Sequence, residues 1–191
     1  TNNIAIGKDV LYSTVNAAGN VAIGQEAMYY VGRSSSDPAG DNHSNVAIGY
    51  QAMKGTAGGS RTQGQTNVAI GYQAMAEFDQ ADAADGSIEK NVCIGWGSGY
   101  YNSGKDNTFL GYATAYNAIS LTGYSNVGIG TLAMFKLTSG SENIVIGPNC
   151  GYNLLSGDRN VVIGSRAAEN LATGDKCVMI GYRPVCANAD S

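Results

Sequence analysis

The sequence contains few of the residues on which most enzymes and nucleic-acid-binding proteins depend. Its 191 residues include one His, one Trp and three Pro, and only 14% of them are charged. The 11 Lys and Arg residues are spread singly and the formal net charge is −4, so the chain lacks the clustered positive charge that phosphate backbones require. No apolar run approaches the roughly 18 residues that span a bilayer. We therefore expect no nucleic-acid partner and no membrane insertion.

The first residues also lack the charged and apolar blocks of a signal peptide. The chain begins with Thr-Asn-Asn-Ile-Ala-Ile-Gly, which belongs to a pattern that recurs further along. We therefore expect the chain to be a segment of a longer protein.

Glycine is abundant, with 27 residues, and much of it is periodic. The usual interval is 17 residues, and longer intervals contain insertions at about 33–44, 54–66 and 76–90. Such a period is typical of solenoids, in which each unit stacks on its neighbours. We therefore predict one all-β repeat domain over residues 1–191, a parallel β-roll or β-solenoid of ten coils of about 17 residues. Each coil has one Ile-Gly or Leu-Gly step, with the glycine at Gly7, Gly24, Gly49, Gly71, Gly95, Gly111, Gly130, Gly147, Gly164 and Gly181.

A second column of the repeat holds asparagine four residues before the glycine in nine of the ten coils. In stacked coils these side chains would form a ladder, because each amide can bond to the equivalent amides above and below. The predicted ladder includes Asn20, Asn45, Asn67, Asn126, Asn143 and Asn160.

The other columns suggest the course of one coil. The residues between Asn and Gly predict a short strand, followed by a glycine corner, a second short strand and a turn. A further glycine recurs seven residues before the first, and we expect it to supply a positive φ in that turn. This second column consists of Gly64, Gly104, Gly123, Gly140, Gly157 and Gly174.

Alternation along the first strand assigns its side chains to two faces. We expect the Val and Ile side chains to point into the roll, and the residue between them to point outward with the Asn. The outward residues then form a row of mostly small side chains along the roll. Such a row suits the close approach of another surface, so we expect a homo-oligomer packed on it. Lysine at both Ala47 and Ala69 would then prevent assembly. The row consists of Ala5, Ala22, Ala47, Ala69, Cys93, Gly128 and Val145.

The motif Asn-Val-Ala-Ile-Gly, repeated with short intervals of Gly and Asn, resembles the head repeat of YadA-like trimeric autotransporter adhesins. Its extended form, Asn-Val-Ala-Ile-Gly-Tyr-Gln-Ala-Met, is more similar still to the related repeats of bacteriophage tail fibres. The resemblance covers all ten coils. It implies a left-handed β-roll in a homotrimer, and a structural and host-attachment role in a phage tail fibre, on the virion tail. The alternative is the head domain of a bacterial adhesin, on the bacterial outer surface.

The segment that adjoins the carboxyl end would separate these two hypotheses. Fibres of this kind often continue into an endosialidase-type intramolecular chaperone domain that cuts itself off, whereas an adhesin head continues into a coiled-coil stalk and a membrane anchor. The chain stops at Asn188–Ser191, directly after its last coil, which fits such a cleavage junction and an artificial boundary equally well. The coils are longer than is usual in adhesin heads. Coils five and six also depart from the repeat at Trp96–Gly99 and Thr108–Leu110, where we expect local irregularity.

Insertions at one point of successive coils emerge on one side of a solenoid. We expect this side to contact a host cell-surface glycan or protein, because recognition usually lies on loops of a rigid scaffold. The alternative is tolerated decoration without a ligand. The acidic residues between Glu77 and Glu89 fit no EF-hand loop, so we interpret them as a solvated loop rather than a calcium site. The candidate contact residues are His43, Arg61, Asp79, Asp82 and Asp85.

The sequence does not favour an enzyme. His43 is the only imidazole, and no nucleophile lies at a suggestive spacing from it. The sequence has no phosphate-binding loop and no dinucleotide fingerprint, so we expect no cofactor. A polysaccharide depolymerase is a third hypothesis, and it would need paired carboxylates about 5 to 9 Å apart in one groove.

Tyrosine and cysteine leave further alternatives. A column of tyrosines five residues after the glycine could stack sugars or pack between coils, and we favour packing. The four cysteines have neither a Cys-x-x-Cys pair nor partnering His, so we expect no metal site. Cys177 and Cys186 flank the last corner and are a candidate disulfide pair. Cys93 and Cys150 lie three coils apart and are expected to be buried thiols. The tyrosine column consists of Tyr12, Tyr29, Tyr100, Tyr116 and Tyr152.

Overall fold

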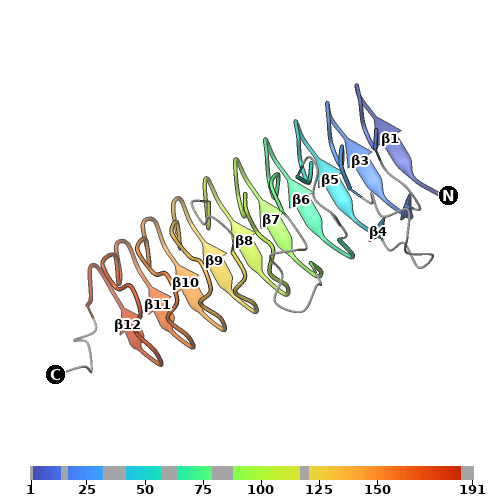
Figure 1. The fold of residues 1–191 in the computed structure, drawn as a ribbon. Coiled ribbons are helices and arrows are strands. Elements are labelled where there is room, and N and C mark those ends of the chain that lie inside the picture. The colour runs from blue at the N-terminus through green and yellow to red at the C-terminus, as the bar shows by residue number, and fades with distance from the viewer. Residues whose placement is uncertain are drawn as a thin grey trace.

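The chain winds into a solenoid around one long parallel sheet (Figure 1). The structure is a computed structural model that describes residues 2–13, 17–31, 42–56, 64–78, 88–116 and 121–185. Within these ranges it contains strands and turns and no helix. The predicted all-β solenoid is confirmed.

Ten strands of three residues form the sheet, one from each coil, and they follow one another in sequence order. Each strand lies between the repeated Asn and the repeated Gly. The strands are β1 (Ile4–Ile6), β3 (Val21–Ile23), β5 (Val46–Ile48), β6 (Val68–Ile70), β7 (Val92–Ile94), β8 (Thr108–Leu110), β9 (Val127–Ile129), β10 (Ile144–Ile146), β11 (Val161–Ile163) and β12 (Val178–Ile180).

Neighbouring strands pair in the same register at every step. Val46 pairs with Val68, for example, and Ala47 pairs with Ala69. The intervals between successive glycines range from 16 to 25 residues, so the additional residues lie outside the strands. Coils five and six keep this register, since Cys93 pairs with Phe109. The irregularity expected there is therefore absent from the sheet.

The glycine after each strand is required for two reasons. Its φ lies between 124° and 142°, a region that L side chains rarely adopt. Successive glycines also stack so closely that a Cβ on Gly71 would overlap the carbonyl group of Gly95. Both reasons explain why glycine fills this position in all ten coils.

The second glycine column has a different role from the one predicted. Gly123 and Gly140 are not among the residues with positive φ. The positive φ lies two residues later, at Ser125 (55°) and Glu142 (58°). A Cβ on Gly123 would instead collide with the carbonyl oxygen of Gly140. Glycine is needed in this column because stacked backbones approach closely, and the turn prediction was wrong.

The segment after each glycine corner is a series of turns rather than the predicted second strand. Two of its residues in each of the first nine coils, such as Gln51 and Met53, have φ near +50° (53° and 51°), at a cost of roughly 1–2 kcal/mol for each residue that is not glycine. Hydrogen bonds between coils hold this backbone in place. The Gln51 N–H donates to Gln25 O (2.9 Å), and the Met53 N–H donates to Ala74 O (2.9 Å). Repetition of these bonds from coil to coil offsets the cost of the left-handed residues.

The core is a narrow column between the sheet and this turn segment. It contains the middle residue of each strand from β3 to β12 and side chains four and seven residues after the glycine. The sizes of these residues compensate within a coil: Ala47 accompanies Met53, whereas the larger Phe109 accompanies Ala115. Fully buried members include Ala22, Ala47, Ala69, Cys93, Phe109, Val145, Val162, Met28, Met53, Met75, Met134, Val31, Phe78, Leu137 and Leu154.

The large side chain of Phe109 is also accommodated by small residues in the neighbouring coils. A Cβ on Gly99 in the preceding coil would lie 3.2 Å from Cδ2 of Phe109, and a Cβ on Gly128 in the following coil would lie 3.1 Å from Cδ1. The ring thus uses space that two neighbouring glycines leave open. This explains how coils five and six depart from the repeat without disturbing the sheet.

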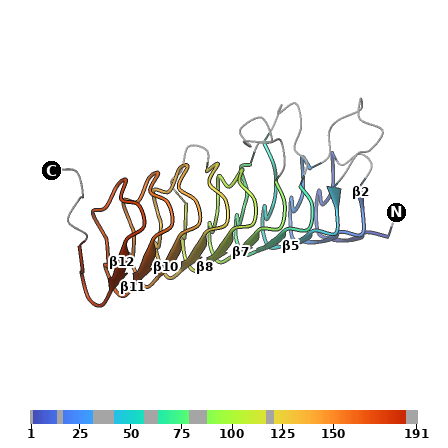
Figure 2. The same cartoon turned by 90° about the horizontal axis from the view of Figure 1, so that it is seen from below.

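Two further strands, β2 (Ala17–Ala18) and β4 (Asn42–His43), pair in parallel away from the ten-stranded sheet. Figure 2 shows β2 on the far side of the roll from the sheet. Isolated parallel bridges, Gln65 with Glu89 and Asn102 with Leu121, link other coils. This side of each coil leads back into the next strand of the main sheet.

Candidate interaction surface

The outward side of the ten-stranded sheet is aliphatic along its whole length. The first and third residues of each strand flank the middle residue and point away from the core. Of these twenty positions, all are Val, Ile or Leu except Thr108, and none is charged. We call this surface the aliphatic face.

The aliphatic face is open to solvent in a single chain. Ile144 is 42% exposed and Ile180 is 67% exposed, and most of the other side chains are half-buried against neighbouring strands. Monomeric soluble proteins rarely expose a contiguous apolar patch larger than a few hundred Å². An uncharged strip across ten strands is therefore a candidate interaction surface.

The two faces of the strand lie the other way round from the prediction. Ala22, Ala47 and Ala69 are completely buried, and the Val and Ile on either side of each are the residues that face outward. In these three coils the interior is already filled by Met28, Met53 and Met75 from the turn segment, so only a small strand residue fits beside them. A lysine at Ala47 or Ala69 would place a charge in the core and disrupt the fold itself.

The predicted asparagine ladder is present, but it is buried rather than turned outward. The amide of Asn143 donates to Asn126 Oδ1 (3.0 Å) and to Gly157 O (2.8 Å), and its main-chain N–H also donates to Asn126 Oδ1 (3.1 Å). Side-chain oxygens accept in the same way along the roll. The coil-to-coil bonds join Asn3, Asn20, Asn45, Asn67 and Asn91, and then Asn107, Asn126, Asn143 and Asn160.

A stack of aromatic rings lies at the carboxyl edge of the sheet, the edge at which its strands end. Ring centroids are 5.0 Å apart for Tyr50 and Tyr72, 6.1 Å for Tyr72 and Trp96, and 4.9 Å for Trp96 and Tyr112. We call these four residues the aromatic ladder. The planes are within 18° of parallel, so the inner ring faces are covered by other rings. Packing between coils therefore occupies the faces on which a sugar would stack.

Further rings stack in the predicted tyrosine column. Tyr12 lies 4.9 Å from Tyr29, and Phe135 lies 4.9 Å from Tyr152. In the same column, burial is the main cause that raises the pKa of Tyr100 to about 12, and the charge of Glu77 adds to it. These rings stack between successive coils, in the turn segment that follows the glycine.

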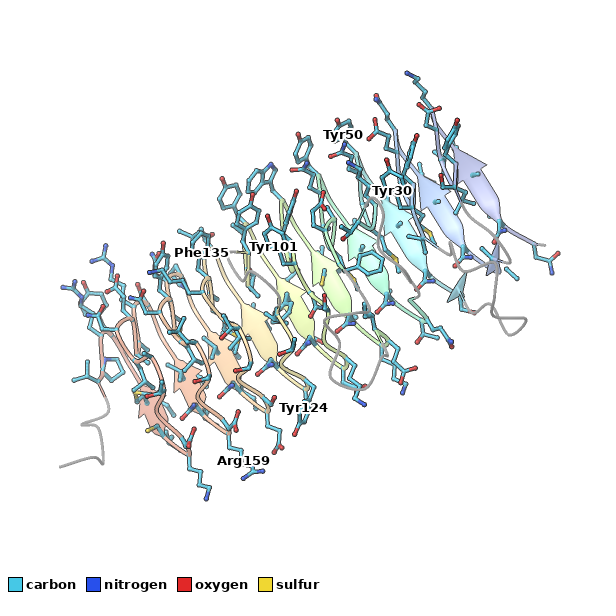
Figure 3. All side chains as sticks on the ribbon, viewed as in Figure 1. Tyr30, Tyr50, Tyr101, Tyr124, Phe135 and Arg159 are labelled. Atoms are coloured by element: carbon cyan, nitrogen blue, oxygen red, sulfur yellow. The ribbon has the colours of Figure 1, made fainter. Side chains whose placement is uncertain are left out.

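The opposite edge, the amino edge at which the strands begin, is polar. Figure 3 shows Tyr124 and Arg159 on this side and Tyr50 on the other. Arg159 Nε donates to Glu142 Oε2 (3.1 Å), and Lys90 Nζ donates to Glu89 Oε1 (2.8 Å). In the coils of the aromatic ladder, the two edges of the sheet thus differ in chemistry.

The three long insertions leave from equivalent points of successive coils. The described chain ends before them at Val31, Thr56 and Phe78. The bases of neighbouring insertions are linked, since Thr56 Oγ1 donates to Phe78 O (3.0 Å) and the Gln65 N–H donates to Ile88 O (3.1 Å). The insertions therefore start side by side, as predicted.

The candidate contact residues lie mostly outside the described residues. The backbone of His43 belongs to β4 and pairs with Ala18, but its side chain is not among those described. Arg61, Asp79, Asp82 and Asp85 also lie outside the described ranges. Their role in binding stays a prediction.

Two of the cysteines are buried, as predicted. Cys93 and Cys150 are completely buried, and burial raises the pKa of their thiols to about 12 and about 11. The main-chain N–H of Cys177 donates to Asn160 Oδ1 (2.9 Å) and so continues the ladder by its backbone. Cys186 lies outside the described residues, so its disulfide with Cys177 stays a prediction.

Across the described ranges, no three His, Cys, Asp or Glu side chains gather where they could hold a metal ion. No helix in those ranges has the length and hydrophobicity needed to cross a bilayer.

Comparison with models of protein families, with curated proteins and with solved structures finds no match.

Proposed function

We propose that this chain is a structural and host-attachment segment of a trimeric phage tail fibre, in which three copies pack through their aliphatic faces. The observation that supports this most is the face itself, because twenty positions on ten strands carry no charge. Three is the number of copies that the resemblance to adhesin and tail-fibre repeats implies.

A second copy of the same chain is the partner that fits this face best. The side chains repeat at the strand spacing of about 4.8 Å along the whole solenoid. A partner can match them at every step only if its own surface has the same period, and another copy necessarily has that period. A globular partner would match the face over a few strands at most.

The size of the face is sufficient for stable association. Burying the exposed part of each aliphatic side chain contributes on the order of 1 kcal/mol, at about 25 cal/mol per Å². Summed over the twenty positions of each copy, this exceeds the roughly 4–15 kcal/mol that association costs. The core of the roll is already buried within one chain, so assembly adds to stability rather than creating the fold.

Packing through the aliphatic face leaves the insertions on the outside of the fibre. Their bases lie on the side of the roll away from the sheet (Figure 2), so the rod would display them laterally. We propose that these insertions, with His43, Arg61, Asp79, Asp82 and Asp85, contact a host cell-surface glycan or protein. We propose no catalytic role for this segment.

Shortening the insertions tests the attachment role. Residues 32–41, 57–63 and 79–87 are each replaced by a short Gly-Ser link, and labelled protein is incubated with a panel of bacterial strains and with their purified surface polysaccharides. We expect the intact protein to bind at least one strain and the shortened variant, at unchanged mass in solution, to lose that binding. Binding that is equal for both proteins, or absent for the intact protein, would contradict the attachment role.

A further inference from the structure

We infer that, in the proposed trimer of parallel copies around one axis, the aromatic ladder of one copy packs against the amino edge of the next. This inference rests on the proposed trimer and goes beyond it, because it specifies which surfaces meet at the seams. The partner is a second copy of this chain in the same orientation.

The topology of the sheet gives it two unlike edges. All ten strands are parallel, so every strand begins at the amino edge and ends at the carboxyl edge. When parallel copies surround an axis, each carboxyl edge meets the amino edge of a neighbour. In a two-fold arrangement with opposed solenoids, like edges would meet instead.

The carboxyl edge carries apolar surface beyond the aliphatic face. Tyr50 and Tyr72 each follow the last aliphatic residue of a strand by two positions, and the four rings of the aromatic ladder remain between 36% and 52% exposed. Their faces are largely stacked on one another, so the surface that remains consists mainly of ring edges and hydroxyl groups. Ring edges carry partial positive charge, and buried Tyr hydroxyls find hydrogen-bond partners, so this surface fits oxygen-bearing side chains.

The amino edge offers such side chains at the matching coils. Ser44, Thr66 and Asp106 are exposed on this edge in the coils that contain Tyr50, Tyr72 and Tyr112. In a cyclic assembly with copies at equal height, each hydroxyl of the ladder would face an oxygen of the neighbouring copy. The ring edges and hydroxyl groups of the aromatic ladder thus complement the oxygen-bearing side chains of the amino edge on the next copy.

The same residues cannot meet within one copy. Thr66 precedes β6 by two residues and Tyr72 follows it by two, so they lie on opposite edges of the sheet. The stretch from Asn67 to Gly71 between them spans about 13 Å at the rise of a strand. Any direct contact between them must therefore join two chains. This separation makes crosslinking a clear test.

The test uses pairs of engineered cysteines in the full chain and a short bis-maleimide crosslinker. One variant combines Thr66→Cys with Tyr72→Cys. A second combines Ser125→Cys with Thr131→Cys, which occupy the same two columns in coil seven and leave the aromatic ladder intact. Each single substitution and the unaltered protein, with its own four cysteines, are the controls. Products are analysed on denaturing gels, and circular dichroism checks that each variant folds.

We expect both double variants to give a covalent species of three chains, because each copy is joined to both neighbours. The single variants should stay at one chain, because equivalent edges do not meet. Two-chain products from a single variant would overturn the inference. So would the absence of crosslinks in a double variant that is trimeric in solution, and in that case the proposed trimer would stand. A mass of one chain for the unaltered protein would overturn both.

Discussion

Asn126 Oδ1 accepts two hydrogen bonds from Asn143, one from its main-chain N–H at 3.1 Å and one from its side-chain amide at 3.0 Å. Asn126 in turn donates its amide to Asn107 Oδ1 (3.1 Å) and Gly140 O (2.8 Å). A buried residue that joins two neighbouring coils by four hydrogen bonds acts as a fixed link in the stack. The repeated Asn is thus explained by its position between coils.

Replacement of this link should destabilise the solenoid. Asn126→Ala leaves the N–H groups of Asn143 and the carbonyl of Gly140 short of partners in a buried site, so we expect a loss of roughly 2–4 kcal/mol in the free energy of unfolding per chain. Asn170 is exposed and outside the ladder, and Asn170→Ala should change stability by less than about 0.5 kcal/mol. Denaturant unfolding of both variants measures the difference. Equal stability of the two would show that the ladder does not hold the coils together.

The compensation of core volumes at Phe109 predicts a coupled pair. A Cβ on Gly128 would lie 3.1 Å from Phe109 Cδ1 and 3.1 Å from Met134 Sδ, so Gly128→Val should destabilise the protein by roughly 1–3 kcal/mol. Phe109→Val leaves a cavity and should cost about 1–3 kcal/mol by itself. Combined, the two changes should cost less than the sum of their separate effects, since the valine at 128 fills space that the ring vacates. A double-mutant cycle from unfolding curves measures this coupling, and strict additivity would contradict it.

The sequence was sufficient to predict the coils, the register and the asparagine ladder, because each depends on spacing alone. The ten glycines fix where every strand ends, and Asn four residues earlier fixes where it begins. The sequence was not sufficient to decide which face of the strand lies inside. Alternation separates Val68 and Ile70 from Ala69, but the inside is set by the width of the roll. Met75 and Phe78 fill that width from the turn segment, and their part in the core was not foreseen.

The positive φ angles in the turn segment also could not be predicted from the sequence. Gln73 and Met75 have φ of 53° and 50°, although neither residue type favours that region. Their conformation follows from hydrogen bonds to the coils on either side, such as the Gln73 N–H to Tyr50 O at 2.8 Å. Local preferences of a single coil cannot show this, because the stabilising partners belong to other coils. The predicted second strand failed for this reason.

Glu26 makes part of the stability depend on pH. A hydrogen bond from Gln51 Nε2 (2.7 Å) is the main cause that lowers the pKa of the carboxyl below its ordinary value of 4.5, and Gln25 and Lys54 add to it against the effect of burial. A carboxyl with a lowered folded-state pKa contributes stability above its ordinary pKa and loses it as pH falls through the lowered one. Glu26→Gln should therefore be less stable than the unaltered protein at pH 7, and this difference should shrink below pH 4.5. Thermal melting between pH 7 and pH 3 measures it, and parallel curves for the two proteins would contradict the role of Glu26.

Adjacent residues on β6 should respond in opposite ways to lysine. Ile70→Lys places a charge on the aliphatic face, so we expect the variant to keep its β-sheet circular dichroism and lose assembly. Ala69→Lys places the charge in the core, so we expect it to lose the fold, since Ala69 is completely buried. Circular dichroism and light scattering distinguish the two outcomes. Assembly that survives Ile70→Lys would exclude the aliphatic face as the interface.

The mass of the unaltered protein in dilute solution tests the central claim most directly. Sedimentation equilibrium over a range of concentrations gives that mass without any substitution or label. The aliphatic face predicts a stable species of three times the 19.7 kDa of one chain, with no dissociation down to micromolar protein. A single chain that stays folded and monomeric over the same range would contradict the claim that this face exists to hold copies together.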